Sequence, residues 1–202
     1  MHFKRTLLST LAVAVLATGP SFVSITAHAS DSASRPVAPV NLSRIRIDNF
    51  GQINANYYRG EQPDGGDYAD LAAIGIKTVI DLQADGDSGE QRFVEAAGMK
   101  FYRIPMTTHV PPTQQQLAKF LEIVSDPAQQ PVYVHCKGGR HRTGVMTAVY
   151  RMEQDGWNAE RAFSEMKRYK FGADFLHPEF KRFVYDYRPA RTVVADAATV
   201  TR

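Results

Sequence analysis

The sequence predicts a single α/β domain with a central, mainly parallel sheet flanked by helices. Short apolar runs of β type alternate with amphipathic segments of helical length, a pattern typical of parallel sheets covered on both faces. The chain has 202 residues, of which 44% are hydrophobic, and this suffices for one domain with a substantial core. No internal repeat indicates another architecture.

The N-terminus is expected to be a signal peptide over residues 1–29, outside the domain. Lys4 and Arg5 precede an apolar run from Leu7 to Ala17, and Ala27-His28-Ala29 is a small-x-small cleavage pattern. A Gly-Pro pair and several Ser and Thr residues interrupt the apolar stretch, which disfavours a transmembrane anchor. We therefore expect an exported protein, periplasmic or secreted, with no stable membrane insertion after cleavage.

Three further segments complete the predicted organisation. Residues 30–44 are rich in Ser, Ala and Pro and are expected to form a flexible leader. The domain is expected over residues 45–188, followed by a loose tail at 189–202. Without the signal peptide the chain keeps 22 basic residues against 21 acidic ones, so its formal charge falls from +3 to +1. This balance gives no reason to expect a nucleic-acid partner.

The first half of the domain is expected to contain strands and two short helices. Alternating apolar residues within 45–53 predict an early strand or hairpin, and residues 57–59 a second short strand. After a turn at 63–66, the other expected elements are a helix over 68–74 ended by Gly75, a buried strand over 77–82, a helix over 88–97 ended by Gly98, and a strand over 100–104.

The second half is expected to be mainly helical around one further strand. A proline-containing loop, residues 105–112, leads to Thr113, which forms a capping box with Gln116, so a helix is predicted to about Val124. Pro131 leads into a strand. The remaining elements are helices over residues 142–154, after the cap Asn158, and from His177-Pro178 to about Tyr187.

Residues 132–144, VYVHCKGGRHRTG, hold the groups best suited to chemistry. An apolar β-type run ends at Cys136, the only cysteine, and a loop with two glycines and three basic residues leads into the predicted helix. Backbone N–H groups in such a turn converge on an anion, and the helix dipole adds to their attraction. The same field favours a thiolate at Cys136. Arg142 offers a planar fork to two oxygens of a tetrahedral oxyanion. We predict a nucleophilic sulfur beneath a phosphate-binding turn.

The predicted topology suggests which side chains surround Cys136. Ligands of parallel sheets bind outside the carboxyl ends of the strands. The segments that follow the strands ending near residues 82, 104 and 135 should therefore lie at one edge. This placement makes Asp85, Asp87, Thr108 and His109 possible neighbours of Cys136.

Residues 135–144, called here the signature loop, resemble the catalytic loop of cysteine-dependent protein tyrosine and dual-specificity phosphatases. The resemblance extends from about Asn56 to Tyr187 and implies a phosphotyrosine-phosphatase-like fold of the dual-specificity type. It also implies hydrolysis through a phosphocysteine intermediate, with no cofactor and no metal. The roles that it implies are nucleophile for Cys136, phosphoryl clamp for Arg142, thiolate support for His135, hydrogen-bond donor to the departing sulfur for Thr143, and backbone turn toward the anion for Gly138 and Gly139.

The loop at residues 105–112 resembles the acid-bearing loop of the tumour-suppressor phosphoinositide phosphatase, with Thr108 where that family has its general-acid Asp. The resemblance places Lys137, Arg140 and His109 around an inositol-phosphate head group. It extends to plant and fungal atypical dual-specificity phosphatases, some of which act on inositol pyrophosphates. The expected substrates are thus phosphotyrosine-type proteins or phosphoinositides and inositol phosphates. Alternatively, Lys137 and His141, also a candidate for substrate binding, are simply solvated at the rim.

The general acid has no obvious position. Asp85 or Asp87 could supply the proton from a neighbouring strand end, and His109 is a third candidate. Both Asp residues also suit an ordinary Gly-rich turn. A second function class is therefore a catalytically impaired phosphate-binding module. Arg59 is expected to form a surface salt bridge, with substrate binding as the alternative.

Overall fold

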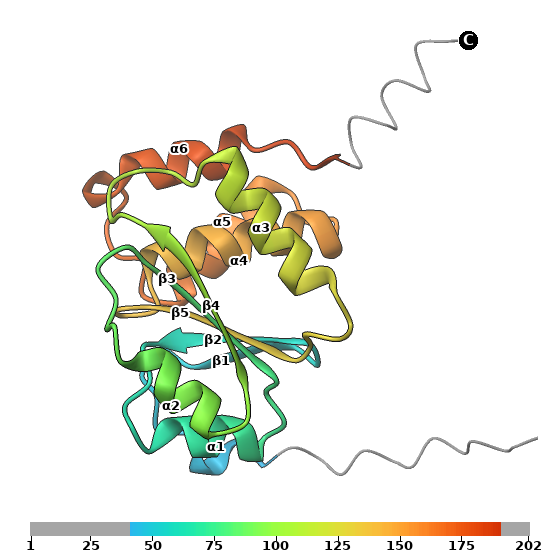
Figure 1. The fold of residues 1–202 in the computed structure, drawn as a ribbon. Coiled ribbons are helices and arrows are strands. Elements are labelled where there is room, and N and C mark those ends of the chain that lie inside the picture. Colours follow the sequence, from blue (N-terminus) through green and yellow to red (C-terminus); the bar gives the residue numbers. More distant parts are fainter. Residues whose placement is uncertain (1–40, 191–202) are drawn as a thin grey trace, which may run out of the picture. The chain divides into compact units, whose positions relative to one another are not determined.

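The computed structural model describes residues 41–190 (Figure 1). The predicted signal peptide, the leader up to residue 40 and the tail from residue 191 lie outside these residues. At the start of the described part, Leu42–Arg44 form a short 3-10 helix, η1, and Leu42 packs against buried residues of the domain.

A five-stranded sheet forms the centre of the domain. Its spatial order is β1-β2-β5-β3-β4, and β1 alone runs antiparallel to its neighbour. The predicted single α/β domain with a mainly parallel sheet is therefore confirmed. The strands are β1 (Gly51–Asn54), β2 (Tyr57–Glu61), β3 (Thr78–Gln83), β4 (Lys100–Met106) and β5 (Val132–Cys136).

Helices cover both faces of the sheet (Figure 1). One face carries α1 (Asp67–Ala73) and α2 (Glu90–Ala96). The other carries α3 and α4, and α5 and α6 pack in turn against α4. Among residues 41–190, no helix is long and apolar enough to cross a membrane. The bounds on this second side are α3 (Gln114–Ser125), α4 (His141–Gln154), α5 (Ala159–Arg168), the 3-10 helix η2 (Asp174–Leu176) and α6 (Pro178–Asp186).

The pleat of β5 divides its side chains between two hydrophobic clusters. Val132, Val134 and Cys136 belong to the cluster beneath α3 and α4. Tyr133 belongs to the opposite cluster with α1 and α2, and the ring of His135 stacks beside it. Alternation along a strand requires this division. Cys136 thus faces the α4 side, whereas His135 faces the α2 side.

Most predicted elements are present, but the start of β1 and the end of β4 differ from the prediction. The capping box is confirmed, since Thr113 Oγ1 accepts from Gln116 N and Gln116 Oε1 accepts from Thr113 N. The early strand begins at Gly51, later than expected, because Ile45 and Ile47 pack on the core without strand pairing. The strand predicted to end at residue 104 continues through Pro105. This continuation is possible because β4 is an edge strand, where proline's missing N–H costs no ladder bond.

Candidate functional site

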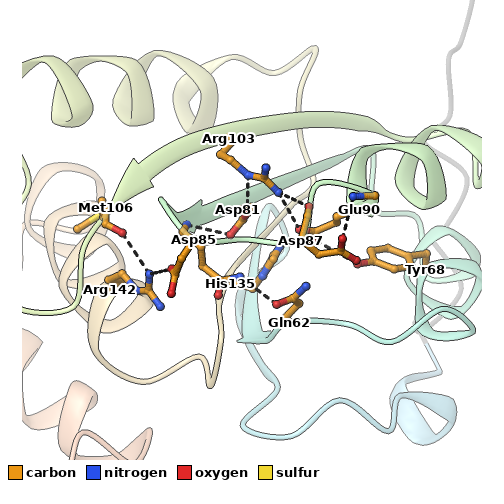
Figure 2. A network of polar contacts seen from close by, with 12 residues as sticks. Gln62, Tyr68, Asp81, Asp85, Asp87, Glu90, Arg103, Met106, His135 and Arg142 are labelled. Atoms are coloured by element: carbon orange, nitrogen blue, oxygen red, sulfur yellow. Dashed lines mark hydrogen bonds and ion pairs between the residues drawn. The ribbon is translucent and has the colours of Figure 1, made fainter.

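The carboxyl ends of the neighbouring strands β5, β3 and β4 lie together at one end of the sheet, as expected. Arg142 in the first turn of α4 joins them, because its Nη1 donates to Asp85 Oδ1 at 3.0 Å and to the Met106 carbonyl at 3.1 Å (Figure 2). Arg142 is only 4% exposed. Its guanidinium is therefore held in place by the segments that follow two neighbouring strands.

Cys136 ends β5 directly before the phosphate-binding turn. It is 3% exposed, and its carbonyl accepts from the Gly139 N–H at 3.3 Å, which closes the turn. Gly139 has φ +61°, a left-handed conformation that favours glycine. The helix α4 starts two residues later. A strand, a tight turn and a helix N-terminus thus follow one another as the sequence indicated.

The turn is attached to β2 through the Gly139 carbonyl. This oxygen accepts from Asn49 Nδ2 at 2.8 Å and from Arg59 Nη2. A Cβ atom at Gly139 would collide with the backbone of Gly60. The second glycine of the signature loop is therefore required by a close approach of two backbones.

Arg59 is fully buried, so the expected surface salt bridge is wrong. Its guanidinium lies 4.1 Å from the centre of the Tyr169 ring, and burial lowers its pKa. The Nε and Nη1 atoms have no hydrogen-bond partner among residues 41–190. Tyr57, Tyr169 and Cys136 oppose this lowering of the Arg59 pKa without cancelling it. The sequence offered one signal, since Arg59 directly follows two aromatic residues, Tyr57 and Tyr58, in a predicted strand.

The side chain of His135 lies on the α2 face of the sheet, opposite to that of Cys136, and its contacts there fix the end of β5 (Figure 2). Its Nε2 lies 2.8 Å from Glu90 Oε1, and both side chains are fully buried. Tyr68 donates to the same carboxylate at 3.1 Å. Arg103 lies 3.7 Å from Glu90 Oε2 and donates to Asp81 Oδ2 at 2.7 Å. The predicted support of the thiolate by His135 would therefore act through the position of the strand end.

The two candidate Asp acids have different surroundings. Asp85 is 78% exposed, and the hydrogen bond from Arg142 lowers the pKa of its carboxyl group. Asp87 Oδ1 instead accepts from the Gly89 N–H at 2.8 Å, and its carbonyl accepts from Arg103 at 2.6 Å. Only Asp85 contacts the predicted phosphoryl clamp. Asp87 shapes the turn that leads into α2.

The predicted histidines lie to one side of the signature loop. His141 Nε2 is 3.0 Å from the Phe171 carbonyl, and burial together with His177 lowers the pKa of His141. His109 is largely exposed, and its ring stacks on that of His177 with 4.9 Å between centroids. Thr108 is exposed. The structure thus gathers His109 and His141 around His177, a residue that the sequence had not suggested for the site.

Three further predicted site residues lie in the turn or in the first turn of α4. Lys137 and Arg140 are exposed, and the Thr143 hydroxyl is buried without a hydrogen-bond partner among the described residues.

Lys137 borders a cavity of about 750 Å³, called here the acidic cavity. Its charged lining residues are basic at Arg46 and Lys137 and acidic at Asp48, Glu61, Asp64, Asp67, Asp85 and Asp87.

Comparison with known proteins places these residues in a family context. The model of the family described as "DSP-PTPase phosphatase fused to NAD+ Kinase" matches residues 36–181. The inositol diphosphatase SIW14 of Saccharomyces cerevisiae is 30% identical over 138 residues, which are 65% of this chain and 49% of the yeast protein. The dual specificity protein phosphatase TpbA of Pseudomonas aeruginosa is 27% identical over 169 residues, 83% of this chain and 73% of that protein.

The fold agrees with these similarities. The crystal structure of the SIW14 core catalytic domain superposes with a TM-score of 0.65 at 25% identity, and the match covers 77% of this chain and 94% of that one. The chain therefore spans nearly all of the yeast catalytic core but about half, 49%, of the whole yeast protein.

Proposed function

The chain belongs to the DSP-PTPase phosphatases of the cysteine-dependent dual-specificity and protein tyrosine phosphatase superfamily, and on this premise we propose that it hydrolyses phosphomonoesters. The observation that carries the proposal is the contact between Arg142 and the Asp85 carboxylate. It shows the buried guanidinium already binding an oxyanion beside the strand that ends in Cys136. A phosphoryl group presents oxygens of the same kind to the same fork.

The proposed reaction has two displacement steps. Cys136 Sγ attacks phosphorus, the bond to the leaving oxygen breaks, and that oxygen takes a proton from an acid. Water then gives a proton to the conjugate base of that acid and attacks the phosphocysteine. The S–P bond breaks, inorganic phosphate leaves, and both the thiolate and the acid are restored. The backbone of the signature loop and Arg142 stabilise the charge on the equatorial oxygens. The Thr143 hydroxyl, which has no partner among the described residues, is available to the departing sulfur.

Asp85 is the acid that this geometry favours. While it is bonded to Arg142, its pKa is lowered, and the carboxyl group is a poor proton donor. A phosphoryl group that takes over Arg142 would free Asp85 and place a second negative charge beside it. Both changes raise the pKa of a carboxyl group. Substrate binding would therefore create the acid for the first step.

The acidic cavity favours phosphotyrosine-type protein substrates over inositol phosphates. The two relatives are named for different substrates, one as an inositol diphosphatase and the other as a dual specificity protein phosphatase. Six acidic side chains and two basic ones line the cavity beside Lys137. A ligand with several phosphates would meet repulsion there, whereas a peptide with neutral or basic residues would not.

Pre-steady-state kinetics with excess p-nitrophenyl phosphate tests the proposed activity. We expect a burst of p-nitrophenol and a trapped phosphocysteine in the wild type, and neither in Cys136→Ser. Tight phosphate binding without product in the wild type would instead identify a phosphate-binding module that lacks turnover. A burst that survives in Cys136→Ser would refute the assigned nucleophile.

The substrate class is tested by comparing kcat/KM for a phosphotyrosine peptide and an inositol pyrophosphate. We expect the peptide to have the higher value. Asp64→Asn together with Asp67→Asn should improve the inositol substrate, because the two substitutions remove negative charge from the cavity. A higher kcat/KM for the inositol pyrophosphate in the wild type would contradict the assignment.

We further propose that the protein is exported. The basic start, apolar run and Ala27-His28-Ala29 pattern within residues 1–29 support a cleaved signal peptide. Cell fractionation and N-terminal sequencing provide the test. A mature N-terminus at Ser30 is expected, and an uncleaved chain confined to the cytoplasm would refute the proposal.

A further inference from the structure

A group of ionisable side chains beside the signature loop has no part in the proposed reaction. The histidine cluster, defined here as His109, His177 and Glu179, joins the β4–α3 loop to the start of α6. One possible ligand atom from each of the three residues lies within 4.8 Å of the others. His141, the first residue of α4, packs against this cluster, with 3.7 Å between its ring centre and that of His177.

One carboxylate oxygen of Glu179 is shared by the two imidazoles of the cluster. Glu179 Oε1 lies 3.4 Å from His109 Nδ1 and 3.3 Å from His177 Nδ1. Charge-assisted hydrogen bonds are shorter, at about 2.7–2.9 Å. Two ligands bonded at about 2.0–2.1 Å to a tetrahedral zinc ion are separated by roughly 3.3–3.4 Å, the edge of that tetrahedron. The shared oxygen is thus spaced from both imidazoles as ligands around one cation would be.

We propose that His109, His177 and Glu179 bind a divalent transition metal ion, with Zn²⁺ as the expected metal. Two imidazoles and one carboxylate are a common zinc ligand set, which leaves a fourth position for water. His141 Nε2 faces the Phe171 carbonyl, so His141 braces His177 through ring packing. Such packing around a ligand fixes its orientation.

A second group of three possible ligands already has a cation. Asp81, Glu90 and His135 also lie close together, and all three are buried. However, the Arg103 guanidinium donates to Asp81 and lies 3.7 Å from Glu90, so it balances these carboxylates. The histidine cluster contains no such basic partner among its described contacts, since its positive charge could come only from the imidazoles themselves.

Metal binding would connect two segments that flank the signature loop. His109 lies in the loop after β4, and His177 and Glu179 lie at the start of α6. A metal ion on all three would hold that loop against α6, next to the first residue of α4. It would also occupy His109, which could then no longer donate a proton. The proposed hydrolysis needs no metal, so this site would stabilise or regulate the enzyme.

Zinc titration of the full chain tests the proposal. Isothermal titration with Zn²⁺ alone is carried out on Cys136→Ser, because the thiolate is itself a zinc ligand. We expect one site whose Kd weakens by at least about tenfold in His109→Gln and in Glu179→Gln, as expected when a metal loses a ligand or its support. Glu122→Gln, an exposed carboxylate in α3 paired with Lys119, is the matched control and should keep the wild-type Kd.

Thermal denaturation gives a second, independent readout. Zn²⁺ should raise the Tm of the Cys136→Ser protein, since a ligand that binds only the folded state stabilises it. The increase should be lost in both ligand variants. The metal-free Tm of His109→Gln should stay unchanged, because the His109 side chain is 67% exposed, whereas the partly buried Glu179 also bonds to His177 in the metal-free protein. Absence of zinc binding, or a Kd and Tm increase that persist in both variants, would overturn the proposal.

Discussion

Asp85 and Asp87 are two residues apart and follow the same strand, yet they occupy different environments. Asp85 contacts Arg142, whereas the Asp87 side chain accepts from the backbone of Gly89. Sequence alone left both as candidate acids. Because Asp85 contacts Arg142, the predicted phosphoryl clamp, its charge is the one that we expect to change when substrate binds.

We expect Asp85→Asn to slow the hydrolysis of alkyl phosphates by at least about 100-fold, since a positioned acid contributes roughly 10²–10⁴-fold. Aryl phosphates should be affected much less, because their leaving groups need less protonation. The pH–rate profile of kcat should lose its basic limb. Asp87→Asn is the control, since it keeps an oxygen for Gly89 N–H. Equal effects of both variants on both substrates would exclude Asp85 as the acid.

Arg59 is the buried cation behind the signature loop, and we expect it to position the turn and to support the thiolate. Arg59→Lys keeps the charge but loses the planar contact with Tyr169, and Arg59→Met loses both. Loss of a hydrogen bond from a charged group costs about 1.5–3 kcal/mol, so kcat/KM should fall roughly 10–100-fold in each variant.

A second measurement separates the two roles of Arg59. Alkylation of Cys136 by iodoacetamide should move to higher pH in Arg59→Met, which removes a positive charge near the sulfur. It should stay near the wild-type profile in Arg59→Lys. Identical alkylation profiles in all three proteins would mean that Arg59 acts on the backbone alone.

At the scale of elements, the signature loop depends on its contact with β2. The backbone at Gly139 is left-handed and lies against Gly60, so a side chain at position 139 has no room. Gly138 lies two residues from Arg140, and the nearest atom to a Cβ at Gly138 would be Arg140 Nε at 3.5 Å, part of a flexible side chain. A side chain is therefore tolerated at position 138 but not at position 139.

We predict that Gly139→Ala lowers kcat by roughly 100-fold, the effect of displacing reacting groups by about 1 Å. It should also lower the Tm, because the backbone is strained and β2 must move. Gly138→Ala should keep the wild-type Tm. Activity assays and thermal denaturation check both variants, and a normal Tm with normal kcat in Gly139→Ala would contradict the packing described.

At the scale of the whole domain, a buried polar network joins the carboxyl end of β5 to the helices α1 and α2. Glu90 in α2 contacts His135 at the end of β5, Tyr68 in α1 and Arg103 in β4. These contacts lie on the α1–α2 face and join two helices to two strands. The position of Cys136 thus depends on a carboxylate that lies on the opposite face.

Glu90→Ala should lower the free energy of unfolding by about 3–5 kcal/mol, because removal of one partner from a buried network leaves the others unpaired. Glu95→Ala, at an exposed position of the same helix, should change it by less than about 0.5 kcal/mol. Urea denaturation measures both. A loss below about 1 kcal/mol in Glu90→Ala would show that the network contributes little to folding.

The sequence by itself determined the features that depend on neighbouring residues. The strand, turn and helix around Cys136 follow from an apolar run, two glycines and a helical segment, which are local signals. The caps at Thr113 and Asn158 likewise placed the starts of α3 and α5. The family resemblance rested on the same continuous stretch, and the match over residues 36–181 confirms it.

Only the tertiary structure decided the features that depend on which strands are neighbours. Because β2 pairs directly with β5, Arg59 is buried behind the turn and not at the surface. Because β3 and β4 end beside α4, Arg142 contacts Asp85 and the Met106 carbonyl and does not contact Asp87. His109 and His177 are 68 positions apart in the sequence, yet their rings stack. Local patterns carry no information on such pairings, since they arise when the sheet order brings distant segments to one edge.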